Sequence, residues 1–186
     1  MKKIKHIKAF SCLLCIFVGA FILSFTSPSA AATFCVGTSA ELQSALTVSG
    51  TNSQDDSIQV QQGTYYGNFV YASTEAFGIT IEGGHTGVLC TVRDVDPANT
   101  VFDGEQNGVV LALSAPNVAA DFAVDGLTIQ NGNVAGDGGG LFIKTDWGNV
   151  TVTNNSIKNN SASNNGGGIL IYEPAVATLT NNIISV

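Results

Sequence analysis

Two stretches of this chain repeat each other without a gap. The first runs from Val124 to Ile143 and the second from Val152 to Ile171. A third copy begins at Leu179, one residue sooner than the same spacing would place it. Val124 falls on Val152, Ile129 on Ile157 and Ile143 on Ile171, and the glycine triplets coincide. A fixed period in the range of roughly 20–50 residues predicts a protein built by stacking copies of one structural unit.

The apolar residues inside each copy alternate with other residues. Leu127 and Ile129 form one pair with a spacing of two, and Leu141 and Ile143 form another. A period of two is typical of β-strands, and no helical pattern separates the two pairs, so the usual helix-linked route to parallel strands is closed. The remaining way to bury these residues is to coil the chain, so that each copy stacks on the previous one. The sequence therefore predicts an all-β fold, a parallel β-helix (solenoid).

Glycine and asparagine recur at matched positions of the copies, and we interpret them as turn residues. Both tolerate the left-handed backbone angles that sharp turns require. The matched glycines are Gly138, Gly139, Gly140, Gly166, Gly167 and Gly168. Asn131 matches Asn159, and Asn154 matches Asn181, so we expect these side chains to form ladders along the stack. The alternative interpretation is that these asparagines form a binding surface.

Upstream of the repeat the pattern is less regular but still favours short strands. They are expected at residues 58–60, 68–71, 79–81, 100–102 and 109–113. Thr38 and Glu41 form a capping-box pattern, which leads into an apolar stripe of Leu42, Ala45 and Leu46. We therefore expect a short helix that caps the N-terminal end of the solenoid, because an open solenoid end needs a cover.

Residues 1–32 have the pattern of a secretory signal peptide. Four lysines precede an apolar run from Ala9 to Phe25, and Ala30 and Ala32 are the small residues that a signal peptidase requires. The alternative is an uncleaved transmembrane anchor, but the run is shorter than the roughly 20 residues that span a bilayer. We therefore expect an exported protein, secreted or at the cell surface, in which residues 1–32 are removed and residues 33–186 form the β-helix domain.

Removal of the signal peptide leaves a strongly acidic chain. Arg93, Lys144 and Lys158 remain as the basic residues against all fourteen acidic ones, so the formal charge is −11. Such a surface repels nucleic-acid backbones and anionic lipid head groups, so neither is an expected partner. Acidity leaves open the binding of divalent cations or basic surfaces, but no metal site and no cofactor are predicted.

Cys35 and Cys90 remain as a pair once Cys12 and Cys15 leave with the signal peptide. An even pair in an exported protein predicts a disulfide, because export leads to an oxidising compartment. The bond would close a loop of about 55 residues and pin the cap helix to the first coils. The alternative, a metal-binding or catalytic thiol pair, has no histidine cluster to support it, since His85 is the one histidine after residue 32.

Two resemblances to known families are visible in these patterns. Residues 154–162 and 166–171 resemble the repeats of polymorphic outer-membrane-type proteins, although glycine replaces alanine and isoleucine replaces phenylalanine in their two motifs. Residues 41–65, which end in Gly63-Thr64-Tyr65, are similar to the first coil of pectin-lyase-like β-helices, as are residues 79–83. Together the resemblances cover about residues 38–186 and imply a right-handed parallel β-helix. They imply no particular activity, because this fold carries lyases, hydrolases and adhesins alike.

Catalysis in a fold of this kind is expected to need paired carboxylates, or a calcium cluster, beside a basic residue. Arg93, Asp94 and Asp96 are the best local candidates, but this segment runs straight into Pro97 and is expected to be a solvated loop. No carboxylate ladder runs down the repeats, because Asp125 aligns with a threonine. We therefore assign no catalytic residue.

Exposed aromatic side chains are the better candidates for a binding site. Their faces pack on the apolar side of a sugar ring, so Trp147 and Tyr172 are predicted carbohydrate contacts. Trp147 lies between two expected strands, in an expected loop. The alternative interpretation is that its ring covers an edge of the core.

The favoured function is a non-catalytic stalk or adhesin-like binding surface, with a carbohydrate or a host or cell-surface protein as partner. The alternative is the N-terminal part of a polysaccharide lyase or hydrolase whose catalytic coils lie beyond Val186. Ile183 and Ile184 indicate a strand of a coil just begun. We therefore expect either that the chain continues or that self-association covers this end.

Overall fold

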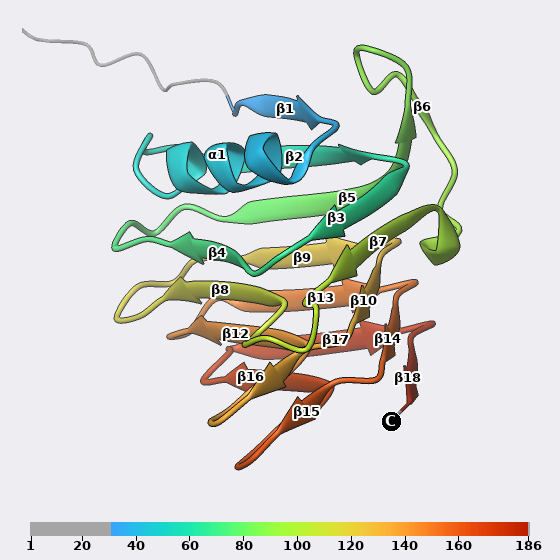
Figure 1. The fold of residues 1–186 in the computed structure, drawn as a ribbon. Coiled ribbons are helices and arrows are strands. Elements are labelled where there is room, and N and C mark those ends of the chain that lie inside the picture. Colours follow the sequence, from blue (N-terminus) through green and yellow to red (C-terminus); the bar gives the residue numbers. More distant parts are fainter. Residues whose placement is uncertain (1–30, 186) are drawn as a thin grey trace, which may run out of the picture.

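The computed structural model describes residues 31–185, so residues 1–30 of the predicted signal peptide lie outside the described residues. Within this range the fold is all-β, with mostly parallel strands in stacked sheets, together with one α-helix (α1, Ser39–Ser49) and one 3-10 helix (η1, Pro97–Asn99). This arrangement is compatible with a β-helix-like solenoid. Figure 1 shows α1 and β1 (Thr33–Val36) at one end of the stack, and β17 (Val176–Thr180) and β18 (Ile183–Ser185) at the other.

Three parallel sheets run along the stack, and successive circuits of the chain, here called layers, add one strand to each in turn. Sheet 1 consists of β1, β2 (Asp56–Gln61), β5 (Ile79–Thr86), β9 (Phe122–Asp125), β13 (Asn149–Thr153) and β17, with the short β6 (Val92–Arg93) antiparallel to β5. Sheet 2 consists of β3 (Gly63–Tyr66), β7 (Thr100–Asp103), β10 (Thr128–Gln130), β14 (Ser156–Lys158) and β18. Sheet 3 consists of β4 (Phe69–Ala72), β8 (Leu111–Ala115), β12 (Leu141–Thr145) and β16 (Ile169–Tyr172). The remaining pair is β11 (Asn133–Val134) with β15 (Ser161–Ala162).

The strand register reproduces the sequence repeat. Val152 on β13 pairs with Val124 on β9 and with Leu179 on β17. Ile157 on β14 likewise pairs with Ile129 on β10 and Ile184 on β18. The residues that align between the three sequence copies are therefore confirmed as neighbours in adjacent parallel strands. The strands expected upstream of the repeat are also present, as β2, β4, β5, β7 and β8, with bounds that differ by a few residues.

The core consists of columns of apolar side chains that stack from one layer to the next. In sheet 2 the column passes through Tyr65, Phe102, Ile129, Ile157 and Ile184. Its first four members are at most 2% exposed, whereas Ile184 is 53% exposed. The β17 and β18 end therefore presents apolar side chains and unpaired strand edges on its outer side. Whether further coils or a second copy cover this end stays a prediction.

The predicted helix is confirmed at its expected position. Thr38 caps α1 by accepting a hydrogen bond from the Glu41 N–H at 3.2 Å. Leu42, Ala45 and Leu46 are buried as the sequence predicts, and α1 packs against β4, β2 and β1. This burial of an amphipathic face, rather than helix propensity alone, holds a helix of this length in place.

The glycine triplets stack directly on each other. The N–H groups of Gly139 and Gly140 donate to the carbonyl oxygens of Gly166 and Gly167 at 3.1 and 3.0 Å. The left-handed conformation predicted for these glycines is confirmed at the first of each triplet, with φ of 71° at Gly138 and 63° at Gly166. The second glycine allows a close approach of the next layer. A Cβ on Gly139 would lie 2.4 Å from the Ser161 carbonyl oxygen and 2.6 Å from that of Gly167.

We expect Gly139→Ala to lower the free energy of unfolding by about 2 kcal/mol. The added methyl group would meet backbone atoms of the next layer on two sides, and those atoms are fixed by the strand ladder. Urea unfolding followed by circular dichroism measures the change. Gly136→Ala is the matched control, because its Cβ would be 3.7 Å from Val134, an ordinary contact. Equal effects of the two substitutions would contradict this explanation.

The asparagines lie at two kinds of position. Asn131, Asn154, Asn159 and Asn181 adopt left-handed angles, with φ between 54° and 59°. The expected ladder is found for one pair, in which Asn181 Nδ2 donates to Asn154 Oδ1 at 3.3 Å. Asn131 instead donates to the Asp103 carboxylate at 2.9 Å. All four asparagines therefore adopt the left-handed angles that the sequence predicts, whereas a ladder bond is found for one of the two expected pairs.

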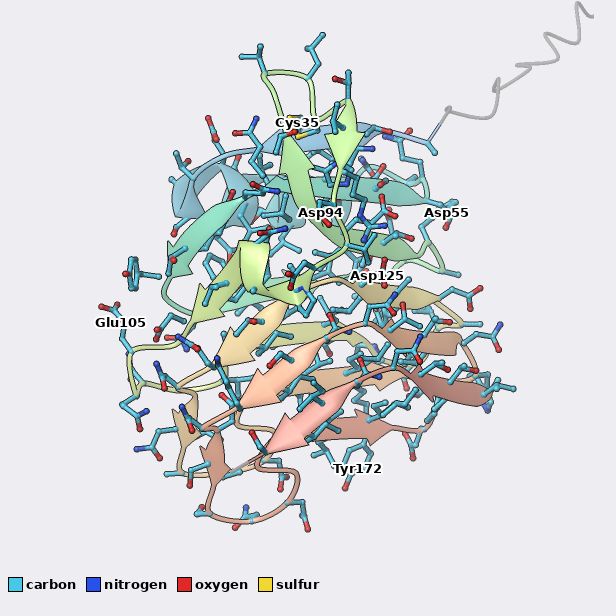
Figure 2. The ribbon with its side chains drawn as sticks, turned by 90° about the vertical axis from the view of Figure 1, so that its right-hand side faces the viewer. Cys35, Asp55, Asp94, Glu105, Asp125 and Tyr172 are labelled. Atoms are coloured by element: carbon cyan, nitrogen blue, oxygen red, sulfur yellow. A yellow bond between two sulfur atoms is a disulfide. The ribbon has the colours of Figure 1, made fainter. Side chains whose placement is uncertain are left out.

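A disulfide joins Cys35 to Cys90, as the sequence predicts, with the two Cα atoms 5.6 Å apart. Cys35 belongs to β1, whereas Cys90 lies in the connection between β5 and β6. Figure 2 shows Cys35 near the end of the molecule that carries β1. The bond therefore ties the first strand of sheet 1 to a segment that projects from its third strand.

Candidate functional site

The exposed corner between β12 and β13 brings together the residues predicted to contact carbohydrate. Trp147 is 70% exposed and Tyr172, at the end of β16 in the next layer, is 44% exposed. The two layers are joined here because the Trp147 N–H donates to the Glu173 carbonyl oxygen at 3.1 Å. Asp146, Trp147 and Glu173 line an open hollow of about 200 Å³. We call these residues, with Lys144 and Tyr172, the Trp147 corner.

The backbone at Trp147 is strained. Its φ is 72°, in the left-handed region where a bulky residue is an outlier that costs of order 1–3 kcal/mol. In the preceding layer the turn after β8 has Asn117 in the same conformation, with φ of 65°. Asparagine accepts this conformation at little cost. The sequence therefore places a bulky aromatic ring where a small polar residue would fit better.

Asp146 and Glu173 line the same hollow as Trp147, and Lys144 lies close to Glu173. Lys144 lies 3.7 Å from a Glu173 carboxylate oxygen, and its ammonium lies 5.7 Å from the centre of the Tyr172 ring. Asp146 Oδ2 accepts a hydrogen bond from the Asn117 N–H at 2.9 Å. Its other oxygen, Oδ1, is buried and has no hydrogen-bond partner among the residues that the structure describes. The corner thus combines an exposed aromatic ring with the exposed Glu173 carboxylate, whereas neither oxygen of Asp146 is open to a ligand.

A second cluster of charges lies on the outer face of sheet 1, and sequence reasoning missed it. Arg93 on β6 donates to Glu82 Oε1 at 3.1 Å and to the Asp125 carboxylate, and its Nε donates to the Gly83 carbonyl oxygen at 2.9 Å. Figure 2 views the molecule from the side on which β6 lies, with Asp94 and Asp125 labelled. Arg93 therefore ties β6 to two neighbouring strands of sheet 1.

The expected solvated loop after Cys90 is more ordered than predicted. It contains β6 and η1, and the two aspartates proposed there hold its turns: Asp96 Oδ1 accepts from the Ala98 N–H at 2.9 Å, and Asp94 Oδ2 accepts from Asn99 Nδ2 at 3.1 Å. His85 is buried beside it, with Nδ1 2.9 Å from the Cys90 carbonyl oxygen and Nε2 3.8 Å from Glu82. The segment after Cys90, which contains β6 and η1, is therefore an ordered loop that is hydrogen-bonded to sheet 1 through Arg93.

Asp125 is poorly suited to act as a general base. Burial raises the pKa of its carboxyl, but hydrogen bonds from Thr153, Arg93 and Asn154 outweigh burial and hold the pKa below its ordinary value. Thr153 and Asn154 donate to Oδ1 at 2.6 and 2.7 Å, while Arg93 occupies Oδ2. Both carboxylate oxygens that could take a substrate proton are thus already shared with donors of the protein.

We expect Asp125→Asn to lower the free energy of unfolding by about 1 to 2 kcal/mol near neutral pH. A carboxylate with a depressed folded-state pKa stabilises the fold above its unfolded pKa of about 3.9, and this contribution disappears as the pH falls through the folded-state pKa. The difference between the wild-type protein and the variant should therefore shrink below about pH 4. Urea unfolding at neutral and acidic pH measures it.

Glu105→Gln is the control for this experiment, because it removes an exposed carboxylate from a turn after β7. We expect no comparable change in stability at either pH. If the gap between the wild-type protein and Asp125→Asn stayed constant through the acidic range, the depressed pKa would not be its cause.

Two other hollows are larger, but their lining residues are less suited to bind a carbohydrate. One, of about 380 Å³, lies between β1 and α1, and its one charged lining residue, Glu41, already accepts a hydrogen bond from the Gly37 N–H at 2.9 Å. The other, of about 390 Å³, is lined by small residues that include Gly50, Ala72 and Ser114. Neither lining contains an exposed aromatic ring, so the Trp147 corner is the better candidate site.

The chain shows no significant match to any protein-family model, curated protein or solved structure. Within residues 31–185, no group of three or more His, Cys, Asp or Glu side chains is arranged to hold a metal ion. No helix in the described part of the chain is long and apolar enough to cross a membrane.

Proposed function

We propose that this protein is an exported, right-handed parallel β-helix that acts as a non-catalytic stalk or adhesin-like display scaffold and binds carbohydrate at the Trp147 corner. Helix α1 caps its N-terminal end. The signal-peptide pattern of residues 1–32 and the disulfide support export to an oxidising compartment, at the cell surface or outside the cell.

The backbone conformation of Trp147 is the observation that carries this proposal. A residue held at a φ of 72°, with its ring 70% exposed, gives up stability without burying its apolar surface. Strained backbone of this kind is concentrated at ligand-binding positions. A ring that is this exposed covers little of the core, which supports the binding role over the core-edge role.

The alternative, the N-terminal part of a polysaccharide lyase or hydrolase, finds less support. Glu82 and Asp125 do form a pair of carboxylates beside Arg93, as such an enzyme would need. However, the low pKa of Asp125 and its donors from Thr153 and Asn154 favour a structural role for this pair.

We expect Trp147→Asn to raise the free energy of unfolding by about 1 kcal/mol and to weaken carbohydrate binding at least about tenfold. Asparagine accepts the left-handed conformation but offers no ring face to a sugar. Urea unfolding measures stability, and titration calorimetry with neutral, amino and acidic oligosaccharides measures binding.

Tyr66→Asn is the matched control, because it removes another exposed aromatic ring, on β3, and should leave binding unchanged. A Trp147→Asn variant that is less stable than the wild-type protein would show that the ring serves the fold. A wild-type protein that binds none of the oligosaccharides would overturn the proposed function.

A further inference from the structure

Asp56, the first residue of β2, is a buried carboxylate for which the structure shows no basic partner. The residue is 4% exposed, and none of the ion pairs within residues 31–185 involves it. Its Oδ1 accepts a hydrogen bond from the Ala32 N–H at 3.0 Å, and its Oδ2 accepts one from Asn52 Nδ2 at 2.7 Å. Both donors are neutral. A buried charge is costly unless an opposite charge balances it, so a cation beside Asp56 would stabilise the fold.

Ala32, the donor to Asp56 Oδ1, is part of the folded stack. Its carbonyl oxygen accepts a hydrogen bond from the Ser57 N–H at 2.9 Å, at the start of the pairing of β1 with β2. Loss of Ala32 would remove this bond and would also leave the buried Oδ1 of Asp56 without its donor. A buried acceptor that loses its donor costs its full desolvation penalty. The fold therefore favours a mature chain that keeps Ala32.

The sequence permits signal-peptide cleavage on either side of Ala32. Signal peptidase requires small residues at the last position before the cut and two positions earlier. Ala30 and Ala32 satisfy this requirement for a cut after Ala32, which is the site expected from the sequence. Ser29 and Ala31 satisfy it for a cut after Ala31. The pattern alone does not distinguish the two cuts, but they leave different groups beside Asp56.

We propose that signal peptidase cuts after Ala31 and that the new α-ammonium group of Ala32 forms an ion pair with the buried carboxylate of Asp56. Water hydrolyses the peptide bond between the two alanines, so that Ala31 leaves with a carboxylate and the Ala32 nitrogen becomes an amine that takes up a proton near neutral pH. This nitrogen already lies 3.0 Å from Asp56 Oδ1. The inference rests on export through a signal peptide, which is part of the proposed function.

The new N-terminus would supply a charge that the side chains do not. Arg93, Lys144 and Lys158 are the basic residues after residue 32, and the first two already pair with other carboxylates. Cleavage after Ala31 converts the neutral bond from the Ala32 nitrogen into a charge-assisted one, which is roughly twice as strong. Cleavage after Ala32 would remove the bond. Removal of the signal peptide thus completes the first contact of the stack only at the earlier site.

The N-terminus of the exported protein is the first measurement. The full chain is expressed in a bacterium with a general secretion pathway, and the exported product is identified by N-terminal sequencing and intact mass. We expect Ala32 as the first residue. Any other first residue, such as Thr33, would overturn the proposed cleavage site and leave export in place. A chain that is not exported, or that keeps its first 31 residues, would overturn the signal peptide and with it the export part of the proposed function.

The reactivity of the Ala32 amine tests the ion pair itself. An opposite charge at hydrogen-bond distance favours the protonated amine, which does not react with acylating reagents. The exported protein is treated at neutral pH with an N-hydroxysuccinimide acetate ester, and peptide mapping by mass spectrometry separates the α-amine from the lysine side chains. We expect the α-amine of the wild-type protein to react at least about tenfold more slowly than that of Asp56→Asn. Equal rates would overturn the ion pair.

The substitution Asp56→Asn is compatible with the local hydrogen bonds. Its oxygen can still accept from the Ala32 nitrogen, and its amide can donate to Asn52 Oδ1, which is buried without a partner among residues 31–185, once the Asn52 amide turns over. Circular dichroism checks the fold. If the variant did not fold, the wild-type protein unfolded in urea would replace it as the reference, with the same expected difference.

Asp55→Asn is the matched control. Asp55 is the exposed neighbour of Asp56, and its Oδ1 accepts from the Gly78 N–H at 2.6 Å, a bond that the amide oxygen of asparagine can keep. We expect the α-amine of this variant to react at the wild-type rate. A rate as high as that of Asp56→Asn would show that the general negative charge of this end, rather than the ion pair with Asp56, protects the amine.

Discussion

Replacing Cys35 and Cys90 together by alanine is expected to lower the free energy of unfolding by about 4 kcal/mol. The disulfide spans 55 residues of sequence, and closing a loop of that length restricts the unfolded chain strongly. Inside this loop lie α1 and the first layer of strands, so loss of the bond also frees β1 at the end of sheet 1. Urea unfolding of the variant and the wild-type protein gives the difference.

Reduction of the wild-type protein with dithiothreitol provides the matched control. It should lower stability by a similar amount, and it should leave the double alanine variant unchanged. A loss of less than about 1 kcal/mol in the variant would show that the packing of α1 and β1 fixes this end of the stack without the covalent link. The same measurement tests the expected oxidising location, because a large loss means that the protein needs such a compartment to reach its full stability.

Asn160→Ala is expected to lower the free energy of unfolding by about 3 kcal/mol. The Asn160 side chain is 5% exposed, and its Oδ1 accepts from the Gly132 N–H at 2.7 Å while its Nδ2 donates to the Ile129 carbonyl oxygen at 2.9 Å. Alanine would remove the acceptor of the Gly132 N–H and a donor to the Ile129 carbonyl oxygen, and a buried backbone group left without a partner costs about 1 to 3 kcal/mol. Urea unfolding followed by circular dichroism measures the loss.

The neighbouring asparagine supplies the control. Asn159 adopts a left-handed conformation with φ of 55°, which glycine accepts readily, so Asn159→Gly should change stability by less than about 0.5 kcal/mol. If the two variants lost stability equally, the turn geometry rather than the inward hydrogen bonds would be the main contribution of this Asn-Asn pair.

The sequence predicted the exposed aromatic residues of the candidate site but not its geometry. Trp147 and Tyr172 could be identified because a ring in an expected loop, and one at the end of an expected strand, indicate an exposed surface. The strain at Trp147 and the unpartnered oxygen of Asp146 depend on how the turns of adjacent layers meet. Those turns differ in length from layer to layer, so the sequence repeat does not show which turn residues of adjacent layers lie beside each other.

The contacts of Arg93 with Glu82 and Asp125 were also not predictable from the sequence repeat. Asp125 aligns with a threonine in the repeat, which argued against a row of carboxylates. Its partner comes instead from the irregular segment after Cys90, 32 residues earlier in the chain. A contact between a repeat and an insertion has no periodic signal, so its residues could not be paired from the sequence.

What the sequence by itself determined was the stacking of this protein: its strands, their parallel register, the apolar columns, the disulfide and the helix at one end. A repeat without gaps leaves little freedom, because a shift of one residue would turn each buried column to the outside. Only the tertiary structure decided which polar side chains face inward. The chain bends at the left-handed Asn159, between β14 and β15, and the next side chain, Asn160, lies in the core, whereas the left-handed Trp147 has its own ring in solvent.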